Sequence, residues 1–267
     1  MKNYFYAIIA LFILNSCKTN PYRLSDRSYK KQINAYRKSI GNADTKPLEN
    51  GQTPKWISTV NFNLRKPNFV IIHHTAQDSL QQTLKTFTLT KTQVSAHYVI
   101  SDDGTVVQML NDYLRAWHGG NASWGKNTDI NSASIGIELD NNGFEPFSEA
   151  QINSLVALLT RLKKDYNIPT NNIIAHSDIA PSRKSDPSAF FPWKNLAALG
   201  FGFWPEDQLE KAPDYFNVEQ ALRIIGYNTQ NLSSAIKAFK LHYIQTEVDD
   251  TLDEKTINTI YSIYKKQ

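Results

Sequence analysis

The chain has 267 residues, of which 41% are apolar and 20% are charged, and its formal net charge at neutral pH is +4. This balance is typical of a folded globular protein and excludes a disordered chain or one that lies mostly in a membrane. The small charge and the scattered basic residues argue against a nucleic-acid partner. The length suits one large domain or two modest ones, so composition leaves the domain count open.

Residues 1–17 differ from the rest of the chain. Lys2 is followed by an apolar run over residues 6–14, which is too short to span a bilayer, and the only cysteine is Cys17. A basic start, a short apolar stretch and a small residue before the cut site are typical of a secretory signal peptide. The Leu-Asn-Ser-Cys sequence that ends at Cys17 resembles a bacterial lipobox, in which the cysteine is lipidated. We therefore expect a lipoprotein signal peptide and a membrane anchor at Cys17; the alternative is an ordinary thiol in a frayed terminus.

The following segment, residues 18–55, is polar and shows little hydrophobic periodicity, so we expect a linker without a core. The apolar run over residues 69–72 is typical of a strand buried on both faces, and it ends at His73. Beyond it, residues 97–100 and 106–110 flank an Asp-Asp-Gly sequence. Because Asp-Gly suits the positive backbone angles of a tight turn, this pattern predicts a hairpin of two strands.

Residues 134–139 predict a further central strand. After it, Ser148 and Gln151 have the spacing of a capping box, and the apolar residues behind them recur at three and four. This pattern predicts an amphipathic helix that stops before Pro169. Another buried run, residues 173–175, leads directly into a histidine. Strands interleaved with helices predict an α/β domain, a class that places its chemistry at strand ends.

Beyond Pro205 the pattern changes to three short helices, expected over residues 218–225, 232–243 and 254–264. We therefore expect a small helical domain over residues 213–267, separated from the first domain by a boundary shortly after Pro205. The sequence contains no internal repeat and no low-complexity tract.

Two histidines and one carboxylate stand out as candidate metal ligands. His73 and His176 each end a buried strand, and Asp186 follows His176 by ten residues. Two histidines and a carboxylate that leave one position open for water form a known type of catalytic zinc site. The spacing alone leaves the question open, because the fold has to bring such distant residues together, and buried structural histidines are the alternative.

Four motifs carry a closer resemblance: Ile-Ile-His-His-Thr at residues 71–75, Ala-Trp-His at 116–118, Ser-Ile-Gly-Ile-Glu-Leu at 134–139, and residues 175–187, which begin Ala-His-Ser-Asp and end Lys-Ser-Asp-Pro. Together and in this order they are similar to the zinc-dependent N-acetylmuramoyl-L-alanine amidases. That family includes periplasmic lipoprotein amidases, phage lysozymes of the amidase type and animal peptidoglycan recognition proteins. The resemblance extends over about residues 55–205.

The resemblance implies a fold and a reaction. The fold is a mixed central β-sheet flanked by helices, with the catalytic domain over residues 56–208. The reaction is hydrolysis of the amide bond between N-acetylmuramic acid, or anhydro-muramic acid, and the L-alanine of the peptidoglycan stem peptide. Peptidoglycan or its muropeptide fragments would therefore be the partner.

The resemblance also implies roles for individual residues. His73, His176 and Asp186 match the ligands of one zinc ion per chain, and Glu138 matches the residue that takes a proton from the attacking water. Lys184 matches a cation that stabilises the oxyanion of the tetrahedral intermediate. The alternatives are a strand-end surface carboxylate for Glu138 and a plain solvated charge for Lys184.

The other histidine motifs point to the substrate or to support of the metal. We expect Trp117, His118 and His97 near the substrate. The alternatives are a structural role for His118 and, for His97, a place in the core or a role in orienting a metal ligand. His74 follows a ligand on the same strand and would therefore face the opposite side. His242 lies in a helical pattern and is expected to be structural.

Two positions depart from the family pattern. Many members have glycine where this chain has Ser188, so the turn after Asp186 could differ. Some relatives place a catalytic tyrosine immediately before the residue that matches His97, and here that residue is Ala96. This second departure places more of the proton transfer on Glu138.

The C-terminal segment, residues 213–267, is similar to three-helix peptidoglycan-binding modules, with a packing extension of the catalytic domain as the alternative. Lys18 after the cysteine is not aspartate, which by family habit favours anchoring in the outer membrane, facing the periplasm. A non-catalytic peptidoglycan receptor or tether is the main alternative function, and a zinc hydrolase of another amide is a weaker one. A receptor has no chemical need for three metal ligands together with Glu138 and Lys184.

Overall fold

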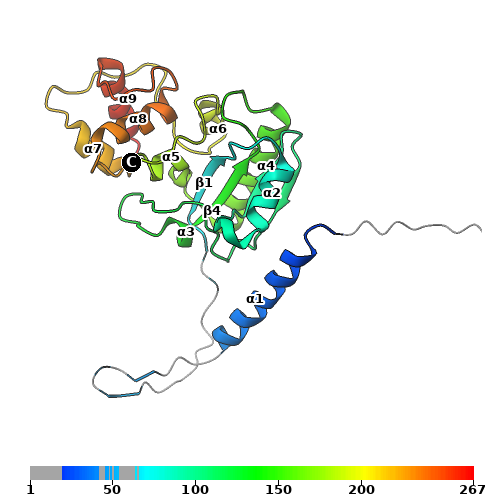
Figure 1. The fold of residues 1–267 in the computed structure, drawn as a ribbon. Helices are drawn as coiled ribbons and strands as arrows, with labels where there is room; N and C mark the ends of the chain where they lie inside the picture. The colour runs from blue at the N-terminus through cyan, green and yellow to red at the C-terminus, as the bar shows by residue number, and fades with distance from the viewer. Residues whose placement is uncertain (1–19, 42–45, 48, 50, 54–63, 65) are drawn as a thin grey trace, which may run out of the picture. The chain divides into compact units, whose positions relative to one another are not determined.

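The structure is a computed structural model that describes residues 20–41, 46–47, 49, 51–53, 64 and 66–267 (Figure 1). The predicted signal peptide with Cys17, and part of the predicted linker, lie outside the described residues. The chain divides into two compact units, Met1–Thr59 and Val60–Gln267.

The first unit contains one described helix, α1, which spans Arg23–Gly41. The sequence predicts a polar linker here, and the structure adds a helix to that description. No residue from 20 to 40 is buried, so the helix packs no apolar face against a core. Asp26 in its first turn and Lys38 in its last turn carry the charges that complement the helix dipole. Helical propensity and charge placement, rather than burial, therefore account for this element.

The second unit is built on a mixed five-stranded sheet, as the family resemblance predicts. Its strands are β1 (Phe69–His74), β2 (Tyr98–Ile100), β3 (Val106–Gln108), β4 (Ser134–Leu139) and β5 (Ile173–Ala175). They lie in the order β3-β2-β4-β1-β5, and β1 is parallel to both of its neighbours. Strand β2 is parallel to β4, and β3 is the antiparallel edge. The carboxyl ends of β1, β4 and β5 therefore meet at one edge of the sheet.

The predicted hairpin joins β2 to β3 through a short turn. The Gly104 N–H donates to the Ser101 carbonyl, and the Ser101 N–H donates to the Thr105 carbonyl, both at 2.9 Å. Within this turn only Gly104 has a positive φ, of 85°. A side chain there would also stand 2.8 Å from the carbonyl oxygen of Ala150, so both backbone angle and space require glycine.

Helix α4, Glu149–Tyr166, covers one face of the sheet. Its predicted capping box is half formed: the Ser148 hydroxyl accepts from the Gln151 N–H at 3.1 Å. The Gln151 side chain does not return to Ser148. Its amide donates instead to the carbonyls of Ile100 and Asp140, at 2.9 and 3.1 Å, and so ties the helix to the ends of β2 and β4.

The remaining helices of this unit are shorter. They are α2 (Leu80–Thr88), α3 (Ile130–Ala133), α5 (His176–Ile179), α6 (Trp193–Ala198), α7 (Val218–Ile225), α8 (Leu232–Tyr243) and α9 (Glu254–Tyr264), with single 3-10 turns at Thr90–Thr92 and Thr170–Asn172. The three C-terminal helices have the bounds that the sequence predicts. Among the described residues, no helix combines the length and apolar character needed to cross a bilayer.

Alternate residues of β1 face two different hydrophobic cores. Val70 and Ile72 pack into the core formed with α4. Phe69 and Ile71 pack into a second core, which contains Leu222 of α7 and buried residues of α8 and α9. Figure 1 shows the C-terminal helices gathered on the α5 side of the sheet, away from α4. The C-terminal helices thus supply part of the core that covers the sheet.

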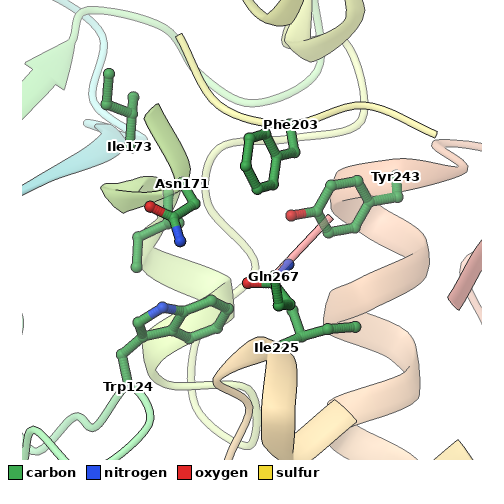
Figure 2. A pocket seen from close by; sticks show the side chains of 8 residues that line it. Trp124, Asn171, Ile173, Phe203, Ile225, Tyr243 and Gln267 are labelled. Atoms are coloured by element: carbon green, nitrogen blue, oxygen red, sulfur yellow. The ribbon is translucent and has the colours of Figure 1, made fainter. Parts of the chain in front are cut away.

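A small cavity lies at the contact between the sheet and the C-terminal helices (Figure 2). It measures about 10 Å³, which is about the space for one water molecule. Trp124 and Phe203 line it from the catalytic side, and Ile225 and Tyr243 line it from the C-terminal helices. Together with the shared core, this packing supports the alternative in which residues 213–267 extend the domain built on the sheet.

Candidate metal centre and active site

The sheet itself brings the predicted residues together. His73 lies in register with Glu138 on the adjacent parallel strand, so both side chains leave the same face of the sheet. On the other side of β1, strand β5 ends at Ala175, and His176 is the first residue of α5. Asp186 is brought back beside His176 by the turns that follow α5, and the Ser177 N–H donates to its carbonyl oxygen at 2.9 Å.

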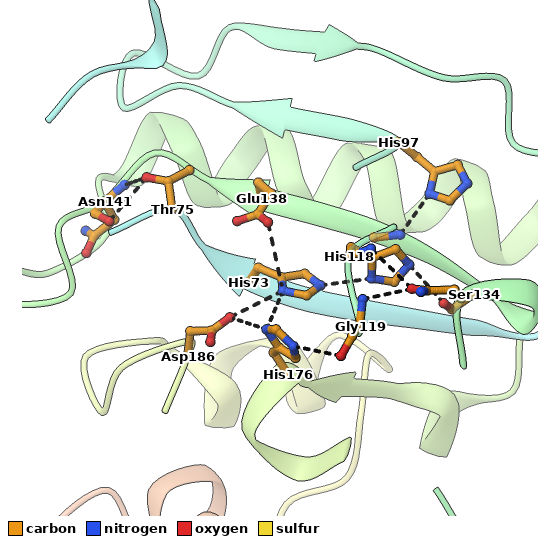
Figure 3. Close-up of polar contacts among 12 residues, drawn as sticks. His73, Thr75, His97, His118, Gly119, Ser134, Glu138, Asn141, His176 and Asp186 are labelled. Atoms are coloured by element: carbon orange, nitrogen blue, oxygen red, sulfur yellow. Dashed lines mark hydrogen bonds and ion pairs between the residues drawn. The ribbon is translucent and has the colours of Figure 1, made fainter. Parts of the chain in front are cut away.

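His73, His176 and Asp186 form a compact buried cluster (Figure 3). The Nδ1 atoms of the two histidines are 2.9 Å apart. Oδ2 of Asp186 lies 3.0 Å from Nδ1 of His176 and 3.3 Å from Nδ1 of His73. All the candidate ligand atoms lie within 4.8 Å of one another, and the described part of the chain contains no other cluster of this kind.

The protonation states of the cluster suit a metal ion. Burial, together with the neighbouring His176, lowers the pKa of His73 from 6.5 to about 4, so its ring is neutral at neutral pH. Burial by itself raises the pKa of Asp186, but its interactions with His176 and His73 outweigh burial and hold the pKa below its usual range. The neutral ring of His73, the imidazole of His176 and a carboxylate directed at one point fit a divalent cation that keeps a further position open.

The ring of His73 is fixed by a chain of hydrogen bonds on its far side. Because Nδ1 faces the cluster, Nε2 carries the proton and donates to Nδ1 of His118, 3.1 Å away. Nε2 of His118 then donates to the Ser134 hydroxyl at 3.1 Å, and that hydroxyl donates to the Ile130 carbonyl at 2.6 Å. His118 is 8% exposed and lies flat over Gly136, where any side chain would occupy the place of its ring.

His176 is fixed in a similar way by the loop that follows His118. Its Nε2 donates to the Gly119 carbonyl at 3.3 Å. The same carbonyl accepts from the guanidinium of Arg183 at 2.6 Å, and Arg183 also donates to the Asn121 carbonyl at 3.1 Å. The tautomers of both histidines are therefore set by partners outside the cluster, as is usual for metal ligands.

Glu138 stands at the rim of the cluster, with Oε1 3.9 Å from Nδ1 of His73. Burial and the nearby charge of Asp186 raise the pKa of its carboxyl from 4.5 to about 8. Lys184 is exposed, and its positive charge acts in the opposite direction on Glu138. A carboxyl with a raised pKa beside a metal cluster is the usual environment of a general acid or base.

The three residues expected near the substrate differ in exposure. Trp117 is 52% exposed and so is free to meet a ligand. His97 is fully buried, accepts from the Gly136 N–H at 3.0 Å through Nδ1 and donates to the Leu114 carbonyl at 2.9 Å through Nε2. These contacts favour the core role for His97 and, with the bond to His73, the supporting role for His118.

The remaining expectations concern residues beside the ligands. His74 takes no part in the cluster, and its Nδ1 accepts from the Ser188 N–H at 3.2 Å. Ser188 does not have a positive φ, so its backbone does not need the freedom of glycine, and the family difference at this position leaves Asp186 within the cluster. His242 is buried in α8, as expected for a structural residue.

One residue near the site was not singled out from the sequence. Asp178 is fully buried two residues after His176 and accepts from the Ala175 N–H at 2.8 Å. An acidic residue three positions after the start of a helical turn is a capping signal that the sequence does contain. Its other partners come from distant parts of the chain, and no local pattern identifies them.

Comparison with known proteins identifies the family. Residues 63–189 match the family model described as N-acetylmuramoyl-L-alanine amidase. The amidase AmiD of Escherichia coli (strain K12) is 34% identical over 219 residues, which cover 70% of this chain and 78% of AmiD. The chain belongs to the N-acetylmuramoyl-L-alanine amidase family. The predicted family and enzyme class are confirmed: the protein is a peptidoglycan hydrolase that acts on the amide bond between N-acetylmuramic acid and L-alanine.

Solved structures agree with this assignment. The structure of E. coli AmiD with a bound anhydro-muramyl tripeptide superposes with a TM-score of 0.69 at 28% identity and covers 84% of this chain and 98% of its own. AmpDh3 from Pseudomonas aeruginosa gives a TM-score of 0.69 at 27% identity and covers 79% of this chain and 96% of its own. The predicted α/β fold with a mixed sheet flanked by helices is therefore confirmed.

Proposed function

We propose that this amidase uses a zinc ion held by His73, His176 and Asp186 to cut the bond between muramic acid and L-alanine. The observation that carries the proposal is the convergence of these three buried side chains at one point beside Glu138. When bound, zinc polarises the scissile carbonyl and lowers the pKa of a water molecule. A receptor that only binds peptidoglycan needs neither the ligands nor the buried carboxyl.

Glu138 is the proposed proton carrier. During hydrolysis the water oxygen bonds to the carbonyl carbon, the carbon–nitrogen bond breaks, and a proton passes from the water to the nitrogen of L-alanine. The pKa of this carboxyl is about 8 in the metal-free protein, and the positive charge of a bound zinc ion would lower it toward neutral pH, where a carboxyl gains and loses a proton at little cost. Its position at the rim of the cluster puts it beside the place where the water has to stand.

Lys184 is the proposed partner of the oxyanion. The support for this role is electrostatic. Lys184 is exposed, and its positive charge lowers the pKa of both Glu138 and His73, so it lies close enough to the cluster to act on a charge that develops there. A positive charge there lowers the barrier by opposing the negative charge that develops on the carbonyl oxygen. Within the described residues its side chain forms no hydrogen bond or ion pair that would hold it elsewhere.

We propose anhydro-muramyl peptides among the substrates. AmiD was solved with anhydro-N-acetylmuramic acid-L-Ala-D-γ-Glu-L-Lys, and AmpDh3 with an anhydromuramic pentapeptide. Exposed Trp117, next to His118, is the side chain we propose to contact the sugar or peptide. Rates on matched muropeptides with reduced and with anhydro ends would measure the preference; no turnover of the anhydro form would contradict this part of the proposal.

The reaction is tested with residues 18–267 incubated with peptidoglycan and with soluble muropeptides, in zinc or in a chelator, with products identified by mass spectrometry. We expect free stem peptides that begin with L-alanine, lost on chelation and restored by zinc. Intact substrate in the presence of bound zinc would contradict the proposed chemistry, and turnover that survives complete metal removal would contradict the zinc site.

We also propose that Cys17 is lipidated and holds the protein on the outer membrane, facing the periplasm. The support is the basic start, the short apolar run and the Leu-Asn-Ser-Cys sequence of residues 1–17. Mass spectrometry of the N-terminus from the native host checks it. An intact Met1 or an unmodified Cys17 would contradict the anchor.

Affinity of residues 213–267 for peptidoglycan is a further part of the proposal, supported by the similarity of this segment to peptidoglycan-binding modules. Because these helices share a core with the sheet, deletion would damage both parts and is a poor test. Tyr215 is 90% exposed, and its replacement by alanine leaves the core intact. Retention of this variant on insoluble wall, compared with that of the unchanged protein, reports binding without loss of fold.

A further inference from the structure

A buried carboxylate connects the metal cluster to the C-terminal helices. Asp178 lies in α5, two residues after the ligand His176, and is fully buried. Its Oδ2 accepts from the Ala175 N–H at 2.8 Å, and so closes the first turn around His176. Within the described residues no lysine or arginine forms an ion pair with Asp178, so its charge depends on other partners.

Those partners both come from the C-terminal helices. Nδ1 of His242, on α8, donates to Oδ2 of Asp178 at 2.6 Å, and the hydroxyl of Tyr227, just after α7, donates to Oδ1 at 2.5 Å. The ring of His242 is itself fixed between two aromatic rings, Trp193 at 3.9 Å and Tyr243 at 4.0 Å between centroids. A buried carboxylate is tolerated only when its lone pairs are satisfied, so these two donors are needed for it to stay in place.

The segment that Asp178 holds carries both loop ligands. The Ser177 N–H donates to the Asp186 carbonyl at 2.9 Å, so a shift of α5 moves both His176 and Asp186. A second bond ties the far end of the same segment: the Gln245 side chain, just after α8, donates to the Phe191 carbonyl at 2.6 Å. The segment from 175 to 193 is therefore attached to the C-terminal helices on both sides of the ligands.

We propose that the C-terminal helices position the zinc ligands His176 and Asp186 through Asp178, with His242 and Tyr227 as positioning residues. This inference rests on the proposed zinc site and gives residues 213–267 a role in the reaction itself, apart from any affinity for the wall. Without the two donors the turn around His176 loosens, and the cluster loses the arrangement that selects a metal ion before one is bound.

The test is zinc affinity, measured by competition with a chromogenic chelator well below the melting temperature of each variant. His242→Leu keeps most of the side-chain volume without a donor, and we expect it to weaken zinc binding about tenfold, the lower end of the effect of outer-shell partners. His242→Asn places an amide N–H near the position of Nδ1, and we expect it to recover most of the affinity. Tyr227→Phe removes one hydroxyl alone, and we expect a weakening of a few-fold.

Ile263→Ala is the matched control, because Ile263 of α9 is equally buried in the same core and contributes no polar atom to Asp178. We expect this variant to melt at a lower temperature with unchanged zinc affinity. The visible spectrum of the cobalt-substituted protein, which reports ligand geometry, should change in His242→Leu and not in Ile263→Ala.

The outcomes separate the inference from the proposed function. Failure of the unchanged protein to bind zinc would overturn the zinc site, and with it this inference. Zinc affinity in His242→Leu and Tyr227→Phe equal to that of the unchanged protein would overturn the inference alone. Equal weakening in Ile263→Ala and His242→Leu, without recovery in His242→Asn, would assign the effect to general loss of packing. If His242→Leu does not fold, Tyr227→Phe decides.

Discussion

The two histidines of the cluster reach it from regions that are held in different ways. His73 lies within β1, whose two edges are both paired in the parallel sheet, and its ring is fixed by His118, also in the catalytic half. His176 begins a helix of only four residues, and that turn is held by Asp178 and two donors from the C-terminal helices. A side chain on a central strand takes its position from the hydrogen bonds to the neighbouring strands. A side chain on a short turn needs contacts from other parts of the chain to hold it.

The comparison also explains why the chain keeps its C-terminal helices close to the sheet. One face of β1 packs against α4, and the other packs against a core shared with α7, α8 and α9. His73 and Glu138 lie on neighbouring strands and take their backbone positions from the sheet alone. The ligands His176 and Asp186 need the sheet and the second core together.

The largest effect is expected from removal of a ligand, where the type of support should not matter. His73→Ala and His176→Ala should each lower zinc affinity on the order of a thousandfold, about a third of the binding free energy of a typical protein zinc site. Elemental analysis after dialysis measures it, with His74→Ala as the matched control, because His74 is a neighbour outside the cluster. Stoichiometric zinc in either variant would show that the replaced histidine is not a zinc ligand, and the comparison of the two histidines would then have no basis.

The next effect concerns proton transfer by Glu138, which lies on β4. Glu138→Gln should retain zinc and lose turnover by about 100-fold to 10,000-fold, the range of general acid–base catalysis. Release of L-alanine stem peptides and metal content are measured on the same sample. Exposed Glu145 in the loop after β4 offers a control, Glu145→Gln, which should keep its rate. An undiminished rate in Glu138→Gln would remove Glu138 as the proton carrier.

The same carboxyl predicts a pH effect on the stability of the metal-free protein. The folded state keeps the proton of Glu138 up to about pH 8, while the unfolded chain releases it near 4.5, so the unfolding free energy falls as the pH rises between these values. Glu138→Gln removes this loss and should be more stable than the unchanged protein by about 4–5 kcal/mol at pH 8.5, and equal to it at pH 4. Denaturant unfolding in a chelator measures both; a constant difference across the range would contradict the buried position of Glu138.

The smallest effect sharpens the comparison most. His118→Phe keeps a ring over Gly136 but loses the bond to His73, and we expect zinc affinity to fall about 10-fold to 100-fold. Combined with His242→Leu, the two losses should multiply, because the supports share no partner. A double variant that is no worse than His118→Phe alone would show that both supports act through one element, and the distinction between the two regions would fail.

Much of the fold follows from local patterns. The continuous apolar runs at 69–72 and 173–175 form strands buried on both faces of the parallel part of the sheet, and Ser148 marks the start of α4 through its hydroxyl. Helix α1 is different: Tyr29, Ile33, Tyr36 and Ile40 recur at intervals of four and three, but polar residues dominate the segment and none of the four side chains is buried. Helix α2 begins with a capping signal. The Ser79 hydroxyl accepts from the Gln82 N–H at 3.3 Å, and the Ser-to-Gln spacing of three residues is visible in the sequence.

The residues of the site also differ in how far the sequence predicts them. The proposed ligands His73, His176 and Asp186 were predicted through motifs, because each lies beside residues that the family shares. The supports were not, because they join residues far apart in the chain: His118 lies 45 positions from His73, and His242 lies 64 positions from Asp178. Such pairs are set by how the layers pack, and no periodicity along one segment records them.

The close contact between the His118 ring and Gly136 limits how this enzyme could be engineered. Glycine within a strand costs roughly 0.5–1 kcal/mol relative to alanine, so a library screened for heat resistance alone would be drawn to position 136. An added methyl group there occupies the place of the His118 ring. A thermostable variant chosen in that way would have gained a better strand and displaced the imidazole that orients His73, so screens on this scaffold should select for retained metal as well as for melting temperature.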